Sequence, residues 1–244
     1  MYQFKQEWNR NGCFWFDKKI IENKNWAALP KASKSVFPVI ACHRNEKGEA
    51  FPGELTIAIL CGRDEKTVRL GIKGLEGFPD IKIQNYVTKR GRRSKKFFIS
   101  KPPQDKGRAF PFYKSVLEGG NWLHLSPSAQ ALYPVMRYFG YFDSEIPELH
   151  CEYEEYDSSY FDEAYRTRDW DLCEAELGIL AEYAKISIRA VRPALRNLEK
   201  YHLIENYVDE SRKGWKVFLR SNFYYARDYL NEGIMKRYAT PGTE

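Results

Sequence analysis

Residues 57–76 read IAILCGRDEKTVRLGIKGLE, and this stretch predicts two short helices joined by a tight turn. Ala58 is a small residue where the two helices would cross, and Gly62 stands four residues later at the turn. Asp64 occupies the position where the second helix needs an N-cap. At about 100° per residue, that helix separates apolar from cationic side chains. The apolar side holds Val68, Gly71, Ile72 and Leu75, and the opposite side holds Lys66, Arg69 and Lys73.

The same pattern occurs a second time. Residues 180–199, LAEYAKISIRAVRPALRNLE, align with 57–76 at an offset of 123, with Lys185 in place of the turn glycine. Residues 14–40 align with 110–136 at an offset of 96, with nine identical pairs in 27 positions. We therefore interpret the chain as two copies of one module, the second with about 27 extra residues. The second copy repeats the apolar side as Val191, Ala194, Leu195 and Leu198, opposite Arg189, Arg192 and Arg196.

The region before each helix pair predicts a short strand and a longer helix. Residues 14–16 and 110–112 alternate Phe-x-Phe, which is typical of a strand. Pro38 and Pro134 stand late in the following helix and should bend or end it. Four aromatic residues of this region are expected in the core rather than as base-stacking platforms: Trp26, Phe37, Trp122 and Tyr133.

A β-hairpin is predicted after each helix pair. Residues 81–100, IKIQNYVTKRGRRSKKFFIS, and 203–221, LIENYVDESRKGWKVFLRS, each read as strand, glycine-containing turn and strand. A helix-turn-helix followed by a hairpin resembles the winged-helix family, over about 25–100 and 121–220 if the extra residues are set aside. The resemblance implies a mostly helical α+β fold with two winged-helix modules related by duplication, each a three-helix core plus a hairpin wing.

The module boundaries follow from composition. We assign 1–101 to the first module, 102–109 to a linker after the Pro-rich and charged KPPQDKG (101–107), and 110–225 to the second module. Residues 226–244 form a C-terminal tail, and an acidic insertion spans about 143–172. The insertion is either a competitor for the basic wings, a docking surface for a cationic partner, or a solvated loop, and the solvated loop is the favoured interpretation.

In winged-helix proteins the second helix commonly enters the major groove while the wing lies over the backbone or minor groove. The resemblance thus implies DNA contacts by Lys66, Thr67, Arg69, Lys73, Arg189, Arg192 and Arg196, by Lys89, Arg90, Arg92, Arg93, Lys95 and Lys96 in the first wing, and by Arg212 and Lys213 in the second. The arginines around Gly91 suit a narrow minor groove, and the wing lysines suit phosphates. Arg69 or Lys66 suits guanine, and Glu65 suits cytosine. Asp209 and Glu210 weaken the second wing, so the first module is the expected stronger anchor.

The charge distribution agrees with a polyanionic partner. Residues 143–176 contain 13 acidic and two basic residues, so the rest of the chain carries a net charge of +17. This favours nucleic acid over a membrane, because no long basic amphipathic helix with a wide apolar face is evident. The first residues lack a signal-peptide pattern and no apolar run could span a bilayer, so a cytoplasmic protein is expected.

Catalytic and metal-binding patterns are missing from the sequence. There is no P-loop, GxGxxG after a strand, nucleophile elbow or HxH cluster. The five cysteines form no CxxC pair and are expected as reduced core thiols. Asp169 and Asp171 stand among other acids, which we interpret as compositional. We therefore expect neither an enzyme, nor a cofactor, nor a metal site.

The predicted function is double-stranded DNA binding, by a transcription regulator or by a plasmid or mobile-element replication initiator. The two-module arrangement of the chain is similar to that of plasmid replication initiators. The alternative is a winged-helix scaffold that binds proteins and not DNA. A homodimer, and a replication or transcription protein, are further candidate partners. Salt-dependent affinity for duplexes separates DNA binding from the scaffold.

Overall fold

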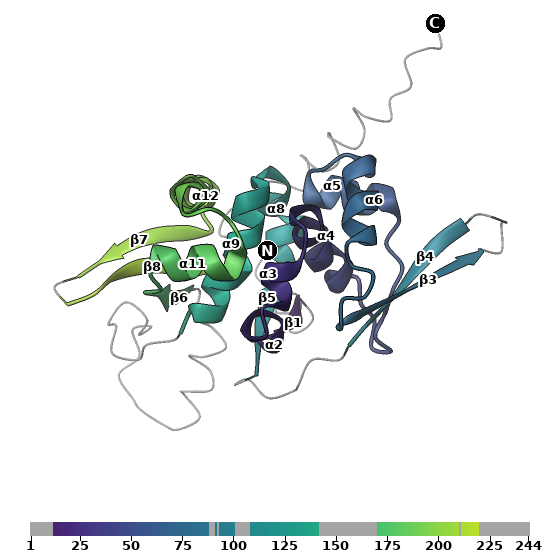
Figure 1. The fold of residues 1–244 in the computed structure, drawn as a ribbon, viewed down its shortest axis with the longest axis horizontal. Coiled ribbons are helices and arrows are strands. Elements are labelled where there is room, and N and C mark those ends of the chain that lie inside the picture. The colour runs from purple at the N-terminus through teal and green to yellow at the C-terminus, as the bar shows by residue number, and fades with distance from the viewer. Residues whose placement is uncertain are drawn as a thin grey trace, which may run out of the picture.

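The same order of elements runs twice along the chain, which is of the mixed α+β class predicted from the sequence (Figure 1). The computed structural model describes residues 12–87, 91, 93–100, 108–141, 170–209 and 211–219. The first unit consists of β1 (Cys13–Asp17), α2 (Lys19–Glu22), α3 (Asn25–Ala28), α4 (Lys31–Cys42), β2 (Glu49–Ala50), α5 (Glu54–Cys61), α6 (Glu65–Lys73), β3 (Ile81–Val87) and β4 (Arg93–Ile99). The second unit consists of β5 (Ala109–Tyr113), α7 (Lys114–Glu118), α8 (Asn121–His124), α9 (Pro127–Phe139), β6 (Trp170–Cys173), α11 (Leu177–Ala184), α12 (Ile188–Lys200), β7 (Ile204–Val208) and β8 (Lys213–Phe218).

Each unit carries a three-stranded antiparallel sheet built on its hairpin. The strand order is β2-β4-β3 in the first unit and β6-β8-β7 in the second. The last pairs before the hairpin tips are Val87–Arg93 and Val208–Lys213. The edge strands β2 and β6, which the sequence pattern does not predict, widen each hairpin into a sheet.

The two units meet about a local two-fold axis. Strands β1 and β5 pair antiparallel, with Trp15 opposite Pro111 at the centre and Phe14 opposite Phe112. Trp15 and Pro111 occupy equivalent positions of the repeat. The residue before Trp15 therefore pairs with the residue after Pro111, and the residue after Trp15 pairs with the residue before Pro111, as a two-fold axis requires. The phenylalanines of one strand stack on those of the other, with ring centroids 5.0 Å apart in both stacked pairs. The duplicated aromatic strands therefore bind each other and join the two units.

Reciprocal hydrogen bonds of the repeated tryptophans obey the same symmetry. Trp26 Nε1 donates to Ala131 O at 2.9 Å, and Trp122 Nε1 donates to Ser35 O at 3.0 Å. Ser35 and Ala131 are also equivalent positions, so each bond is the two-fold copy of the other. The core prediction is confirmed, because all four aromatic residues are buried: Trp26, Phe37, Trp122 and Tyr133.

A buried polar side chain in each long helix crosses to the other unit. Lys34 Nζ on α4 donates to Ala184 O at 2.9 Å. Gln130 occupies the equivalent position on α9, and its Nε2 donates to Cys61 O at 3.1 Å. Ala184 and Cys61 are the last residues of α11 and α5, so these contacts are again two-fold copies. They also satisfy helix C-terminal carbonyls that would otherwise lack partners.

The prolines of the long helices do not end them. Helix α4 continues from Pro38 to Cys42, and α9 continues from Pro134 to Phe139. All residues of 33–42 and 129–137 are buried. Packing against both units thus outweighs the hydrogen bond that each proline removes.

The acidic insertion leaves and re-enters the second unit at one place. Tyr141 N donates to Leu172 O at 3.0 Å, and Leu172 N donates to Tyr141 O at 2.9 Å. Tyr141 and Leu172, on either side of residues 142–169 in the sequence, therefore lie side by side. Residues 170–172, assigned to the insertion from the sequence, belong to β6. Asp171 of that strand is buried with its Oδ2 3.8 Å from Arg137 Nη2, which gives this carboxylate a structural role.

Candidate nucleic-acid interface

The two helices of the repeated pattern are joined by the same turn in both units. Gly62 ends α5 with φ 65°, and Lys185 ends α11 with φ 53°, so both adopt the left-handed conformation. The following N–H donates to the carbonyl of the small residue, Ala58 or Ala181, at 3.0 and 3.1 Å. A Cβ on Gly62 would lie 1.9 Å from Leu123 O, so the approach of α8 also requires glycine there. Lysine tolerates the conformation at a cost of about 1–2 kcal/mol, and Lys185 keeps the turn although the sequence match is weaker.

Helix α6 presents cations outward from a capped N-terminus. Asp64 accepts hydrogen bonds from Thr67 Oγ1 at 2.7 Å and from Thr67 N at 2.8 Å. These bonds hold the pKa of Asp64 below its ordinary value. The Thr67 hydroxyl, a predicted DNA contact, is thus engaged in the cap. The buried side of the helix holds Val68, Gly71 and Ile72, and its exposed side holds Lys66, Arg69 and Lys73.

Helix α12 has the same two faces and three exposed arginines. It buries Val191, Ala194, Leu195 and Leu198 and exposes Arg189, Arg192 and Arg196. None of these arginines forms a salt bridge with any residue that the structure describes. Pro193 does not interrupt the helix, which runs from Ile188 to Lys200. Its cationic face is therefore free of ion pairs over the described part of the chain.

Of the corresponding cations of the first unit, Arg69 is paired with carboxylates, whereas Lys66 and Lys73 form no salt bridge with a described residue. Arg69 Nη1 lies 3.3 Å from Glu54 Oε2 and 3.6 Å from Glu65 Oε2. Lys95 Nζ on β4 lies 2.7 Å from Glu54 Oε1. Burial alone would raise the pKa of Glu54, but the hydrogen bonds and charges of Lys95 and Arg69 outweigh it and lower the pKa. Sequence reasoning missed Glu54, because its contact with Lys95 depends on how the hairpin lies against α5.

The first wing lies partly within the described residues. Lys89, Arg90 and Arg92 fall outside them. Arg93 begins β4. Lys96 Nζ lies 2.5 Å from Glu49 Oε1 and 4.6 Å from the ring centroid of Phe98. Lys96 is thus held at the base of the hairpin by an ion pair and an aromatic face, rather than standing free for a phosphate.

An aspartate closes the second wing. Asp209 accepts hydrogen bonds from Arg212 N at 2.7 Å, from Ser211 N at 2.8 Å and from the Tyr207 hydroxyl at 2.6 Å. From the sequence, Asp209 was expected to weaken DNA binding by the second wing. In the structure, its hydrogen bonds stabilise the turn of that hairpin. Lys213, at the start of β8, is exposed beside it.

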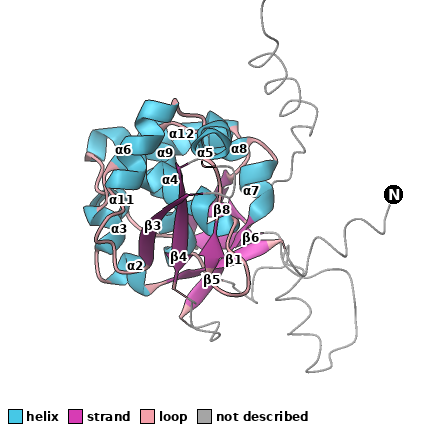
Figure 2. Cartoon of the chain, turned by 90° about the vertical axis from the view of Figure 1, so that its right-hand side faces the viewer, coloured by secondary structure: helices cyan, strands magenta, loops and turns pink. Residues whose placement is uncertain are grey.

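The two cationic helices occupy one side of the molecule. In the views of Figures 1 and 2, α6 and α12 both lie in the upper half of the molecule. The hairpins β3–β4 and β7–β8 extend toward opposite ends in Figure 1. This arrangement gives the chain two equivalent cationic helices and two lateral extensions.

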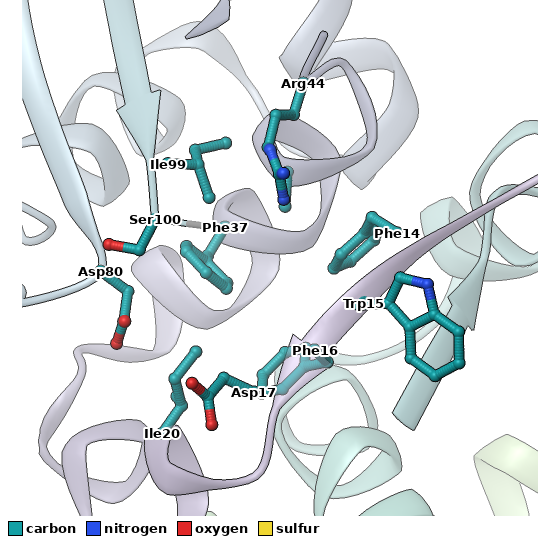
Figure 3. Close-up of a pocket in the computed structure, with 11 residues that line it drawn as sticks. Phe14, Trp15, Phe16, Asp17, Ile20, Phe37, Arg44, Asp80, Ile99 and Ser100 are labelled. Carbon is teal, nitrogen blue, oxygen red and sulfur yellow. The ribbon is translucent and has the colours of Figure 1, made fainter. Parts of the chain in front are cut away.

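A cavity beside β1 is too small for a metabolite. Its volume is about 20 Å³, and Phe14, Phe37 and Ile99 line it (Figure 3). A space of that size holds about one water molecule. Asp17 and Asp80 also line it, and burial, with the charge of Asp17, raises the pKa of Asp80.

The buried thiols are unreactive near neutral pH. Burial raises the pKa of Cys42 to about 12 and that of Cys61 and Cys173 to about 11. Cys151 lies outside the described residues. Over the described part of the chain, no cluster of three His, Cys, Asp or Glu side chains is placed to hold a metal. No helix there has the length and apolar character to cross a bilayer.

The predicted contacts differ in how accessible their charges are. Exposed cations without a salt bridge to any described residue are Lys66, Lys73, Arg189, Arg192, Arg196 and Lys213, whereas Arg69, Lys95 and Lys96 are paired. No protein-family model, curated protein or solved structure matches the chain. The functional assignment therefore depends on these residues and their geometry.

Proposed function

We propose that the chain binds double-stranded DNA through two winged-helix units, with α6 and α12 as the major-groove helices. The observation that carries the proposal is the pair of equivalent helices on one side of the molecule, each with a buried apolar face and three exposed cations. Each helix follows the same turn and precedes a hairpin sheet. This order is that of a reading helix followed by a wing.

Electrostatics make α12 the stronger anchor of the two reading helices in this proposal. Binding to phosphates releases condensed counterions for every cation that is free to neutralise one. Arg189, Arg192 and Arg196 are all free of salt bridges within the described residues, whereas in α6 only Lys66 and Lys73 are, because Arg69 is bound to Glu54. This comparison concerns the helices alone, because Lys89, Arg90 and Arg92 of the first wing lie outside the described residues.

Two biological roles use such a protein. A transcription regulator occupies a promoter, and a plasmid or mobile-element replication initiator binds origin sites and recruits replication proteins. Selection of bound sequences from random duplexes, followed by footprinting, tests the DNA binding that both roles require. We expect two protected segments about 10 base pairs apart. A chain that ignores duplexes at low salt would instead support the protein-interaction scaffold.

Replacing Arg189, Arg192 and Arg196 by alanine should weaken duplex binding and its salt dependence. The slope of log affinity against log salt should become shallower by about 0.9 for each phosphate that the variant no longer neutralises. These positions are exposed on a helix where alanine is favourable, so the fold should persist.

The matched control replaces the same three arginines by lysine. Lysine keeps the charge but lacks the planar fork that binds a base edge bidentately. The lysine variant should keep the salt slope and lose only the discrimination between the selected site and other duplexes that α12 itself contributes. An alanine variant with an unaltered slope would place α12 away from the DNA.

A further inference from the structure

One of the positions at which the two units differ lies between the cationic helix and the hairpin. Glu54 is the first residue of α5, and the equivalent first residue of α11 is Leu177. The arginine that Glu54 contacts is repeated, because Arg192 is equivalent to Arg69. A carboxylate therefore stands among the candidate DNA-binding residues of the first unit and is replaced by an apolar side chain in the second.

Glu54 joins α6 to the hairpin. Its two oxygens bind different elements, with Oε2 3.3 Å from Arg69 Nη1 and Oε1 2.7 Å from Lys95 Nζ. Glu54 and Lys95 also line an open groove of about 710 Å³ between the start of α5 and the hairpin. Under the proposed function, this is the place where helix and wing face the duplex together.

A carboxylate at this place affects phosphates and bases differently. Phosphate binding by Arg69 or Lys95 brings two anions close to each other, which costs energy at any sequence. The O6 and N7 atoms of guanine are neutral acceptors, and Arg69 can reach them with its remaining N–H groups while Nη1 stays on Glu54. Glu54 then fixes the direction of the guanidinium group instead of competing with the ligand.

We propose that Glu54 determines the sequence specificity of the first unit by holding Arg69 for the O6 and N7 edge of a guanine and by opposing phosphate contacts of Arg69 and Lys95. This inference rests on the proposed DNA binding. The second unit, with Leu177 at the equivalent position, supplies affinity through α12 without this selection.

The test compares Glu54→Gln with Glu76→Gln. Both changes remove one negative charge from the first unit, but Glu76 is exposed and has no salt bridge to a described residue. Affinities are measured for the selected duplex and for a scrambled duplex of equal length and composition at several salt concentrations.

We expect E54Q to bind the scrambled duplex several-fold more tightly, with a steeper salt slope from the released Lys95 and from Arg69, whose remaining ion pair is the longer one with Glu65. The ratio of selected to scrambled affinity should fall by about tenfold, the discrimination typical of one bidentate base contact. E76Q should leave this ratio unchanged. Replacing the selected guanine by 7-deazaguanine should weaken wild-type binding and leave E54Q nearly unaffected.

Each contrary outcome has a distinct meaning. If E54Q and E76Q have the same ratio of selected to scrambled affinity, the proposed role of Glu54 is wrong, but the proposed DNA binding is not contradicted. Equal loss of affinity for both duplexes in E54Q makes Glu54 a structural residue and overturns it as well. A wild-type chain that binds no duplex overturns the proposed function, and this inference with it.

Discussion

Lys34 is a buried cation at the contact between the units, where its charge is disfavoured. Burial lowers its pKa to about 8, and the neighbouring charges of Lys31 and Lys185 act in the same direction. Its Nζ nevertheless donates to Ala27 O at 3.2 Å and to Ala184 O at 2.9 Å. The amine therefore keeps its hydrogen bonds in either protonation state, and only its charge costs stability.

The free energy of unfolding should carry a pH dependence that belongs to Lys34. Its folded pKa of about 8 lies below the ordinary 10.5, so the unfolded chain holds more protons between these values. The contribution of Lys34 to stability should rise with pH across this window, by at most about 3 kcal/mol. Lys34→Gln removes the titration and copies Gln130 at the equivalent position.

Denaturant unfolding of both proteins from pH 8 to pH 10.5 measures this effect. The wild type should gain stability relative to the variant as the pH rises. Cys42, Cys61 and Cys173 titrate oppositely in this range but are present in both proteins and cancel. A difference that stays constant with pH would contradict the lowered pKa of Lys34.

Single-residue roles could be predicted where they follow from helix periodicity. The division of α6 into buried Val68 and Ile72 and exposed Arg69 is a consequence of 3.6-residue spacing. The pairing of Glu54 and Glu49 with wing lysines is not, because the first depends on how the hairpin lies against α5 and the second on the pairing of β2 with β4. The positions of the candidate cations could thus be predicted from the sequence. Which of them are already paired with a carboxylate could not.

At the scale of the elements, the acidic insertion of the second unit has no counterpart in the first unit. The mutual hydrogen bonds of Tyr141 and Leu172 join the segment just after α9 to β6 directly, and neither bond involves residues 142–169. Short strands such as β2 and β6 escaped prediction because two to four residues show no readable periodicity. The longer helices and both hairpins have such periodicity or a glycine turn.

Replacing residues 142–169 by a short Gly-Ser connection should preserve the fold. The replacement spares β6, and loop-closure entropy changes little with loop length. Thermal unfolding should show a midpoint within a few degrees of wild type. Duplex affinity at 0.15 M salt should also be unchanged if the insertion is the solvated loop predicted from the sequence. Markedly tighter binding would instead identify the insertion as a competitor for the cationic helices.

At the scale of the whole molecule, the units share one hydrophobic core. Buried residues from both units belong to a single cluster that includes the paired aromatic strands and Trp26 and Trp122. The internal repeat was visible in the sequence, but its two-fold packing was not. Similar sequence predicts similar units, whereas the face by which they meet depends on complementary contacts between copies.

Cutting the connection between the units should leave them associated. A protease site placed within residues 101–107 would separate the chain after β4 and before β5. Because the shared core and the reciprocal tryptophan bonds remain, the two pieces should elute together in gel filtration. Their unfolding midpoint should become dependent on concentration. Separate elution at micromolar concentration would contradict an association of this strength.

The two-fold relation between the units has a consequence for the DNA. Two reading helices related by such an axis address the strands of a duplex as an inverted repeat, which most proteins read only as dimers. Under the proposed function, one polypeptide carries both halves, so a monomer would suffice, and the halves need not be identical. The expected operator is an imperfect palindrome. The half-site bound by α6, whose Arg69 is held by Glu54, should tolerate fewer base changes than the half-site bound by α12.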